Sequence, residues 1–321
     1  MRTAWFLLLP NTHILDLAGP LQVISTCPEL GIAPLQVRCI GPSPQISCFQ
    51  AIQLAGLEPM PAQLGEGDLL FVIGHKLLPA GRSDPLQAQA VRWLRDVAGS
   101  TAGLVVCSIC TAAFLLGEAG LLDERDCTTH HRYAAQLQQR FPRARVVDNQ
   151  LFVQDGNLYT SAGVSTGIDL TLQLIRQHLG RQQANQVAQE LVIYRRRAGN
   201  DPQLSARDLA RNHIHPLIHD VQDFLEQHFT QPIVVEDLAR HFNLSYRHLA
   251  RLFRSHAGMT LKGFLGKLRI DHARHLLATQ RIPAELLAER CGFSSSHALR
   301  LAWNKEMSLS PLQYHKLALT E

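Results

Sequence analysis

The sequence of 321 residues lacks the features that mark membrane and secreted proteins. A bilayer-spanning helix needs about 18 consecutive apolar residues, and no apolar run is that long. The N-terminal run Ala4–Leu9 contains six apolar residues after a single basic one, and no small-residue cleavage site follows it, so it does not fit a signal peptide. We therefore expect a cytoplasmic protein that does not associate with a membrane.

The cysteines also lack an organising pattern. There are seven of them, an odd number, and their spacing fits no disulfide framework. Cys107 and Cys110 have the CxxC spacing of a zinc-binding pair, but the second pair that a structural zinc site needs does not occur in the sequence. We expect a reduced protein without a bound metal or cofactor.

The first two thirds of the chain carry no excess of positive charge. Residues 1–202 contain 16 Lys and Arg against 16 Asp and Glu, whereas residues 203–321 contain 15 against 11, together with 11 of the 16 histidines. The whole formal excess of +4 therefore lies in the C-terminal third. This distribution is expected if only that part contacts a polyanion, although an excess of this size alone is weak evidence.

Residues 1–180 alternate short β-rich apolar runs with helical patterns. This alternation predicts an α/β fold, a flavodoxin-like sandwich with a mostly parallel sheet between helices. Asp155, Gly156 and Asn157 form a turn signal between two apolar runs, which predicts a β-hairpin. We expect strands at 4–9, 35–40, 69–73, 103–108, 145–148, 151–154 and 158–161, and helices at 17–26, 85–98, 112–119, 167–179 and 184–194.

The chain changes character after the last of these helices. We assign residues 1–197 to the first domain and the polar, turn-rich stretch 198–215 to a linker. From 216 to 318 the pattern is helical throughout, and we assign this range to a second domain.

Three consecutive arginines stand at the end of the first domain, at 195–197. They either contact DNA phosphates or form a solvated helix end, where positive charge is favourable. The second interpretation needs no ligand and is the simpler of the two.

Two segments of the second domain share one plan. In the first, Leu238 and Ala239 lie on one face of a short helix, and Ser245 is placed to cap the next helix after a tight turn. In that next helix Leu249 and Phe253 face inward, which leaves an exposed side rich in arginine. Two short helices of this kind, joined by a tight turn, are typical of a helix-turn-helix unit.

The second segment repeats the plan. Its first helix covers 284–291, Gly292 and Phe293 form the turn, Ser294 is the expected cap, and the second helix covers 295–305. The segment therefore predicts a second helix-turn-helix unit.

A helix of 19 residues, Leu261–Thr279, lies between the two units. At ~1.5 Å per residue it spans about 28 Å. One turn of B-DNA is about 34 Å long. This helix is therefore long enough to hold two recognition helices in successive major grooves on one side of a duplex.

The second domain resembles the AraC/XylS family of transcription regulators over roughly residues 217–316. The sequence departs from the family at Leu301 and Trp303, where an Arg and a Phe are frequent. Trp303 suits a core, whereas Leu301 puts one backbone or base contact in doubt. The elements that carry the resemblance are Asp237-Leu238-Ala239, Ser245-(x)3-Leu249-x-Arg251-Leu252-Phe253, Arg269-Ile270-(x)3-Arg274-x-Leu276-Leu277, Cys291-Gly292-Phe293-Ser294-Ser295 and Ser310-Pro311-(x)2-Tyr314.

The exposed basic face and the resemblance together predict DNA contacts. Arg247 and Arg251 carry guanidinium groups that either pair with a guanine edge or bind phosphate. Arg269 and Arg274, in the helix between the units, are expected to form structural ion pairs rather than DNA contacts. The residues expected to contact DNA are Ser245, Arg247, His248, Arg251, Ser295, Ser296, His297 and Arg300.

In the first domain, residues 105–114 run from a strand into a helix, and Cys110 lies at the turn. A side chain there projects into the cleft above the sheet edge. The free amides and dipole of the following helix are expected to lower the pKa of this cysteine. Cys107 falls inside the strand and is expected to be inert core.

This domain resembles the DJ-1/PfpI branch of the class I glutamine amidotransferase-like fold over about residues 3–180. In that superfamily Cys110 occupies the position of the elbow cysteine, and Asp16 that of an acid that contacts it. Protease- and amidase-like members have His directly after the cysteine, whereas this chain has Thr111, as isocyanide-hydratase-like members do. His75 follows Gly74 where a second glycine is common. The matching pieces are Leu15-Asp16-Leu17-Ala18-Gly19-Pro20, Cys110-Thr111-Ala112-Ala113-Phe114, Ala119-Gly120-Leu121-Leu122-Asp123, Thr128-Thr129-His130 and Ser161-Ala162-Gly163-Val164-(x)2-Gly167-Ile168-Asp169.

Several roles stay open from sequence alone. Cys110 is a pocket residue of a sensor, an active nucleophile or a remnant of the fold. Asp16 either lines the pocket or caps the following helix. His130 either contacts a ligand or is a structural hydrogen-bonding residue, and His131 should face solvent. The residues assigned to a ligand pocket are Asp16, Gly74, His75, Cys110, Thr111 and His130.

An amidotransferase-like domain joined to an AraC-type module resembles a subgroup of that family whose members sense small nitrogen-containing metabolites, such as quaternary amines or amino acids. The resemblance implies a sequence-specific regulator, usually an activator of catabolic genes, without catalytic residues. It implies double-stranded promoter DNA, a small-molecule effector, RNA polymerase and a second copy of the chain as partners. The alternative is a cysteine-dependent hydrolase or hydratase of the DJ-1/PfpI superfamily that carries a DNA-binding module.

Overall fold

The chain divides into two compact units, an N-terminal unit of residues 1–203 and a C-terminal unit of residues 204–321. The computed structural model describes residues 2–78, 84–193, 197, 199, 201–203, 210–211, 213–307 and 309–320. The end of the helix predicted at 184–194, Arg195 and Arg196, and much of the linker predicted at 198–215 lie outside the described residues.

A seven-stranded sheet forms the centre of the N-terminal unit. Its strands are β1 (Thr3–Leu7), β2 (Gln36–Gly41), β5 (Glu58–Pro59), β6 (Leu69–Val72), β7 (Val105–Ile109), β10 (Phe152–Asp155) and β11 (Leu158–Ser161). They lie in the order β10-β11-β7-β6-β1-β2-β5. Neighbours are parallel except β10, which pairs antiparallel with β11 at one edge. Such a sheet brings the carboxyl ends of β1, β6, β7 and β11 to one edge, where loops can assemble a site.

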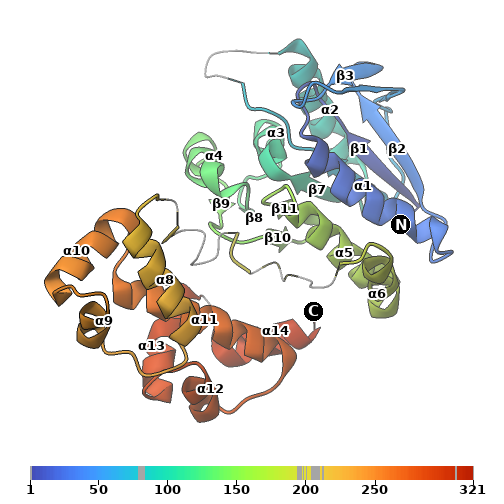
Figure 1. Cartoon of the computed structure of the whole chain (residues 1–321). Coiled ribbons are helices and arrows are strands. Elements are labelled where there is room, and N and C mark those ends of the chain that lie inside the picture. The colour runs from blue at the N-terminus through green and yellow to red at the C-terminus, as the bar shows by residue number, and fades with distance from the viewer. Residues whose placement is uncertain are drawn as a thin grey trace. The chain divides into compact units, whose positions relative to one another are not determined.

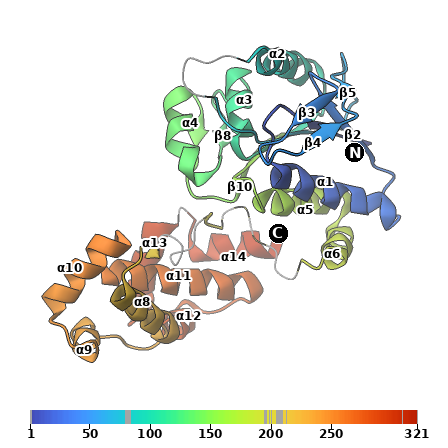
Figure 2. The same cartoon turned by 45° about the horizontal axis from the view of Figure 1, so that its top comes forward.

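Helices cover both faces of this sheet (Figures 1 and 2). Phe6 and Leu7 are adjacent in β1 but belong to different buried clusters, because successive side chains of a strand point to opposite faces. The predicted sandwich of a mostly parallel sheet between helices is confirmed. The cluster of Phe6 includes side chains from α1 (Ile14–Glu29), α5 (Thr166–Leu179) and α6 (Arg181–Glu190), and that of Leu7 from α2 (Pro85–Ser100), α3 (Ala113–Glu118) and α4 (Ala134–Arg140).

Several small elements were not predicted or were placed differently. A hairpin of β3 (Gln45–Ser47) and β4 (Gln53–Ala55) was missed because each strand has only three residues, and α4 was missed as well. The strand predicted at 145–148 is short: β9 (Arg145–Val146) pairs with β8 (Asp126–Cys127) outside the main sheet. The 3-10 turn η1 (Cys110–Ala112) follows β7, and the 3-10 turn η2 (His131–Tyr133) precedes α4.

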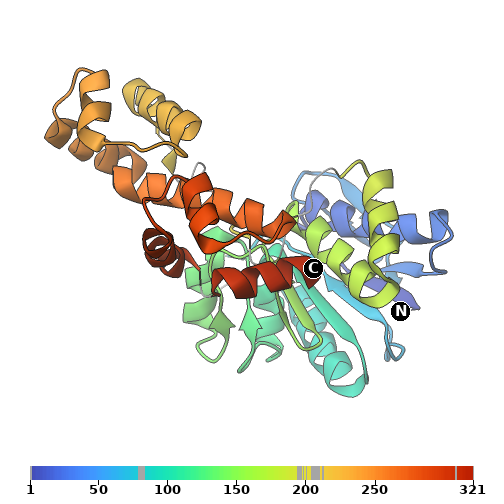
Figure 3. The same ribbon diagram turned by 90° about the horizontal axis from the view of Figure 1, so that it is seen from below.

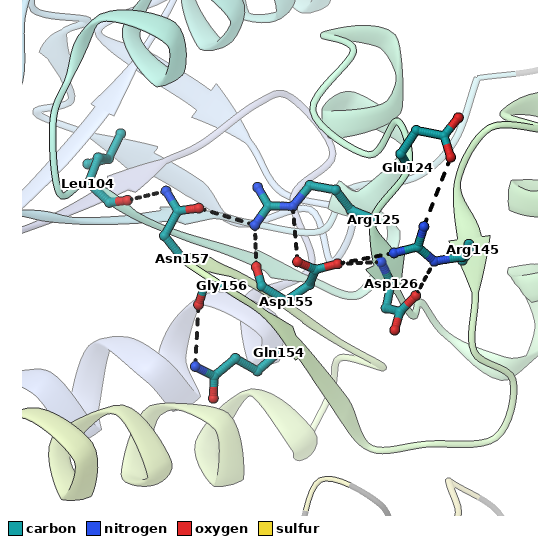
Figure 4. Close-up of polar contacts among 9 residues, drawn as sticks. All are labelled: Leu104, Glu124, Arg125, Asp126, Arg145, Gln154, Asp155, Gly156 and Asn157. Atoms are coloured by element: carbon teal, nitrogen blue, oxygen red, sulfur yellow. Dashed lines mark hydrogen bonds and ion pairs between the residues drawn. The ribbon is translucent and has the colours of Figure 1, made fainter. Parts of the chain in front are cut away.

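The predicted hairpin of β10 and β11 is present, and polar contacts hold its turn (Figure 4). The Arg125 guanidinium donates to the backbone oxygen of Asp155 and to Asn157 Oδ1, and Asn157 Nδ2 donates to Leu104 O (2.8 Å). The Asp126 amide donates to Asp155 Oδ2 (2.8 Å). These contacts fix the end of the hairpin that is farthest from Cys110, because Ser161 at the other end pairs with Ile109.

The C-terminal unit is helical. Its helices are α8 (Pro216–His228), α9 (Val235–His241), α10 (Tyr246–Ala257), α11 (Leu261–Thr279), α12 (Ala284–Arg290), α13 (Ser296–Glu306) and α14 (Pro311–Thr320). The long helix predicted at Leu261–Thr279 is confirmed, and Thr260 caps it by accepting a hydrogen bond from the Gly263 amide (3.0 Å).

Helix α11 belongs to two hydrophobic cores. Phe264, in its first half, packs with Leu249 and Phe253 of α10, whereas Leu277, in its second half, packs with Trp303 of α13. Figure 3 shows α11 in orange between the yellow-orange helices of one core and the red helices of the other. The pair α9–α10 is the first helix-turn-helix and α12–α13 is the second. Among the described residues, no helix is both long enough and apolar enough to cross a membrane.

Candidate functional site

Helix α10 carries the exposed face of the first helix-turn-helix. The Ser245 hydroxyl accepts a hydrogen bond from the His248 amide (3.3 Å), so Ser245 caps the helix as predicted. Leu249 is buried, whereas Arg247 and Arg251 are exposed. Arg251 Nη2 lies 3.3 Å from His248 Nδ1, which places both side chains on the exposed face.

Helix α13 carries the corresponding face of the second helix-turn-helix. Its cap is Ser295, whose hydroxyl accepts a hydrogen bond from the Ala298 amide (3.1 Å). The prediction of Ser294 as the cap is wrong by one residue, because 294–296 are all serine and any of them can cap a helix. The remaining candidates on this helix are the half-buried Ser296 and the exposed His297 and Arg300.

The two departures from the family pattern differ in their consequences. Trp303 is fully buried, its Nε1 donates to Leu309 O (2.6 Å), and its ring packs edge-on against Tyr314. It therefore serves the core, as expected. Leu301 is 62% exposed and offers no hydrogen-bonding group to phosphate or base.

In addition to α11, direct contacts join the second helix-turn-helix to the segment between α8 and α9. Arg269 on α11 donates from Nε to Phe229 O (2.7 Å) and from Nη2 to Gln231 O (2.9 Å), just after α8. Its guanidinium also lies 5.7 Å from the ring centroid of Phe293, in the turn of the second unit. Arg269 is thus structural, as predicted, but it binds backbone carbonyls instead of the expected acidic partner.

Two further residues support this junction. A Cβ on Gly292 would lie 2.6 Å from Phe229 O and 2.7 Å from Thr230 O, so only glycine fits there. Arg274 is buried, lies over the Tyr314 ring and is 3.6 Å from Asp271 Oδ1, which is the structural ion pair expected of it.

The second candidate site is built around Cys110 in the N-terminal unit. Cys110 lies at the turn between β7 and η1 with φ +61°, a left-handed conformation that costs a non-glycine residue free energy. Two glycines make room for it. A Cβ on Gly163 would lie 2.1 Å from Cys110 Cβ, and a Cβ on Gly74 would lie 2.8 Å from the same atom. The assigned pocket residue Gly74 therefore has a packing role beside the cysteine.

Asp16 lies against Cys110 from α1. Its Oδ1 accepts a hydrogen bond from the Val164 amide, 148 residues away, and it makes no cap hydrogen bond to α1. Asp16 is 1% exposed, and this burial raises the pKa of its carboxyl, although the hydrogen bonds from Val164 and Cys110 lower it in part. The structure therefore shows no cap hydrogen bond for Asp16 and places it beside Cys110, and its role in a ligand pocket stays a prediction.

The thiol of Cys110 is held in its neutral form. Burial, and next the Asp16 carboxylate, raise the pKa of Cys110 well above its ordinary value, and the hydrogen bonds from Thr111 compensate only in part. The expectation that the helix start lowers this pKa is wrong. Loss of water around the thiolate, next to a carboxylate, outweighs the amides of a short 3-10 turn.

His75 and Thr111 tie two loops together. The Thr111 hydroxyl donates to His75 O (2.6 Å) and accepts from the His75 amide (3.0 Å), and both residues are buried. Burial lowers the pKa of the His75 imidazole to about 4, so it is neutral at neutral pH. Thr111, through its hydroxyl, and His75, through its backbone, thus hold together the loops that follow β6 and β7, and the assignment of both to a ligand pocket stays a prediction.

The loop that follows β8 lies beside Cys110 on its other side. The Thr129 hydroxyl donates to Cys110 O (2.9 Å). His130 is half-buried, its Nδ1 accepts from the Arg132 amide (3.3 Å), and burial and its basic neighbours lower its pKa. His131 is exposed, as expected.

Side chains that the sequence did not single out form the rim of this site. The Phe49 ring is 49% exposed and lies 4.9 Å from the His13 ring, and the Lys76 ammonium lies 5.2 Å from the Phe49 centroid. The His13 amide donates to Gly74 O (2.9 Å), which places the group beside Cys110. Exposed Val164 adjoins Asp16. Within the described ranges, no three His, Cys, Asp or Glu side chains are arranged to hold a metal ion.

Comparisons with known proteins match both units. The profile of the DJ-1/PfpI family matches residues 4–177, and that of a helix-turn-helix domain matches residues 238–316. The chain is 31% identical over 316 residues to the HTH-type transcriptional regulator CdhR of Pseudomonas aeruginosa, covering 96% of this chain and 90% of that protein. It is 26% identical over 310 residues to the HTH-type transcriptional regulator ArgR of the same organism, covering 95% and 90%.

A solved structure agrees on the fold. The crystal structure of an AraC family transcriptional regulator from Pseudomonas putida has a TM-score of 0.51 and 24% identity, covering 60% of this chain and all of that one. Two helix-turn-helix units joined in one chain to an α/β unit, together with these relatives, define a DNA-binding transcription regulator rather than an enzyme. The chain belongs to the AraC family, with an N-terminal domain of the DJ-1/PfpI family.

Proposed function

We propose that the protein is a sequence-specific transcription regulator, an activator of catabolic genes, whose effector is a small nitrogen-containing metabolite bound at the rim beside Cys110. The observation that carries this proposal is the rim itself. An exposed aromatic ring, two histidines and a backbone loop meet at the carboxyl edge of a parallel sheet, where ligands of such folds bind. The domain assignment 1–197, 198–215 and 216–318 is part of the proposal.

On the DNA side, α10 and α13 enter successive major grooves. Arg247 and Arg251 provide guanidinium groups on the exposed face of α10 and make the stronger contacts. Helix α13 contributes less, because Leu301 leaves its exposed face with an apolar side chain where a contact would otherwise form. Further contacts come from Ser245, His248, Ser295, Ser296, His297 and Arg300.

On the effector side, a protonated or quaternary nitrogen suits the Phe49 ring. That ring already has a cation near it, the Lys76 ammonium, and a ligand cation would take its place. Asp16 is enclosed, so the ligand senses its charge through the Val164 loop rather than by direct contact. Half-buried His13 and His130 supply hydrogen-bonding groups for the polar end of the ligand.

The regulator acts in the cytoplasm, as a homodimer, on double-stranded promoter DNA and together with RNA polymerase. An effector changes activity only if it binds the active and inactive states with different affinities.

A thermal-shift screen of small amines, quaternary amines and amino acids tests the effector proposal. A ligand at 100 times its Kd should stabilise the chain by about 2.7 kcal/mol. Phe49→Leu should abolish the shift, Phe49→Tyr should retain it, and Ile52→Ala, a change at an exposed residue of the same loop, should leave it unchanged. A complete screen without a stabilising nitrogen compound, or a shift indifferent to Phe49→Leu, would refute this assignment.

A further inference from the structure

After residue 193, the described residues of the N-terminal unit are Arg197, Gly199 and Asp201–Gln203, which we call the connector. The chain continues from the connector into the C-terminal unit. The connector binds the N-terminal unit at three places. In the middle, the amides of Phe152 and Leu151, at the start of the edge strand β10, donate to Gly199 O (3.2 Å) and Asp201 O (3.0 Å).

At its start, the connector is held by an ion pair. Arg197 donates from Nε (3.0 Å) and Nη2 (2.5 Å) to Asp169 Oδ2, and its amide donates to Asp169 Oδ1 (3.2 Å). Nη2 also donates to Ser165 Oγ (2.8 Å). Arg197 therefore fits neither sequence interpretation of the arginine run, because it is neither a solvated helix end nor free for phosphate. The Asp169 side chain is buried but that of Arg197 is 36% exposed, so the pair is only partly shielded from solvent and salt.

At its end, the connector is held by one side-chain amide. Gln203 Nε2 donates to Thr129 O (2.9 Å) and Gln150 O (2.8 Å), and its Oε1 accepts from the His131 amide (2.6 Å). The amide group thus uses both its donor and its acceptor on the loop that follows β8. No other residue type has donors and an acceptor in this planar arrangement except asparagine, whose side chain is shorter.

Both anchoring loops also touch Cys110. The loop that holds Arg197 through Ser165 contains Gly163, which packs directly on Cys110, and Val164, which donates to Asp16. The loop that holds Gln203 contains Thr129, whose hydroxyl donates to Cys110 O. A Cβ at Gly163 would collide with Cys110, so the first loop is in tight contact with the cysteine and cannot move closer to it.

We infer that Arg197 and Gln203 form a latch that couples the loops around Cys110 to the connector. A ligand that displaces either loop changes the free energy with which the connector is held, and release of the connector changes the affinity for the ligand by the same factor. The connector leads into the DNA-binding unit, so the latch is the path by which an effector changes DNA binding. This role rests on the proposed function, whereas the coupling itself can be measured without a ligand.

The test uses hydrogen exchange in the full chain, with a substitution as the probe of the loops around Cys110. Gly163→Ala pushes Cys110 aside, and the amides of Phe152, Leu151 and His131, which bind the connector, should then exchange at least ~5-fold faster, the lower limit of typical coupling between sites. If Gly163→Ala does not fold, Cys110→Ala, which removes only the sulfur, serves as the probe. Reciprocally, Gln203→Ala and Arg197→Gln should speed exchange of the Val164 amide.

The matched control is Asn157→Ala, which loosens the same hairpin at its far end by removing the hydrogen bond to Leu104 O. It should leave the Val164 and His131 amides unchanged. Coupling is refuted if exchange of the Phe152, Leu151 and His131 amides does not respond to the substitution at Gly163 or Cys110. It is also refuted if Asn157→Ala speeds exchange of these amides by the same factor. A failed thermal-shift screen would remove the effector but not the coupling, so the two failures are distinguishable.

Discussion

Removal of the Arg269 side chain should loosen the C-terminal unit by an amount that the structure allows us to estimate. Arg269→Ala removes two hydrogen bonds from a charged donor to Phe229 O and Gln231 O, and the contact with the Phe293 ring. Hydrogen bonds to charged groups contribute about 1.5–3 kcal/mol each. Because the guanidinium is only half-buried, we take the lower part of that range, about 1.5–2 kcal/mol for each bond, and expect a loss of about 3–4 kcal/mol in the free energy of unfolding.

The measurement is urea unfolding followed by the fluorescence of Trp303, which is buried in the core of the second helix-turn-helix. Replacing Trp5 and Trp93 with phenylalanine in every variant leaves Trp303 as the only reporter, since the chain has three tryptophans. Arg269→Lys keeps the charge but not the two-pronged donor, and should recover only part of the loss.

Arg254→Ala is the matched control, because Arg254 is an exposed arginine on α10. It should change the free energy of unfolding by less than ~0.5 kcal/mol. The account of the junction is wrong if Arg269→Ala has as small an effect as Arg254→Ala.

Three further predictions follow from the described geometry. Gly292→Ala should destabilise the protein more than Gly258→Ala in the same assay, because both glycines have positive φ but only Gly292 would place a Cβ against backbone oxygens; equal effects would contradict this. His75 has a pKa of about 4 when folded and near 6.5 when unfolded, so the free energy of unfolding should fall by about 3 kcal/mol as the pH drops between these values; His75→Gln should flatten the slope, and an unchanged slope would count against a buried neutral imidazole. Cys110 should resist iodoacetamide in the native protein up to pH 9, so that Cys110→Ser leaves the number of labelled thiols unchanged; rapid alkylation would restore the reactive-thiolate hypothesis.

Local patterns predicted much of this fold. The cap at Ser245 and the helix Leu261–Thr279 follow from neighbouring residues in the sequence, and both are confirmed. The α/β sandwich follows from alternating strands and helices. The cap at Ser295 was missed because three serines in a row offer equivalent hydroxyls, and nothing in the local sequence chooses among them.

The site around Cys110 was harder to predict because its contacts are long-range. Val164 donates to Asp16 across 148 residues, and Gln203 binds Thr129 across 74, so no local pattern reveals either pair. The pKa of Cys110 was predicted in the wrong direction because burial cannot be read from a turn signal. Gly163 lies beside Cys110 only in the folded chain, so its packing role could not be read from Ser161-Ala162-Gly163-Val164 either.

The central claim is that two recognition helices, held by α11 and the Arg269 junction, read one side of a DNA duplex. Footprinting of the full chain on genomic DNA tests it most directly. We expect a protected site of about two helical turns, roughly 20 base pairs, and a loss of about 1–3 kcal/mol in binding with Arg251→Ala. A protected site of one turn, no protected site at all, or an Arg251→Ala variant that binds as tightly as the natural chain would contradict the account.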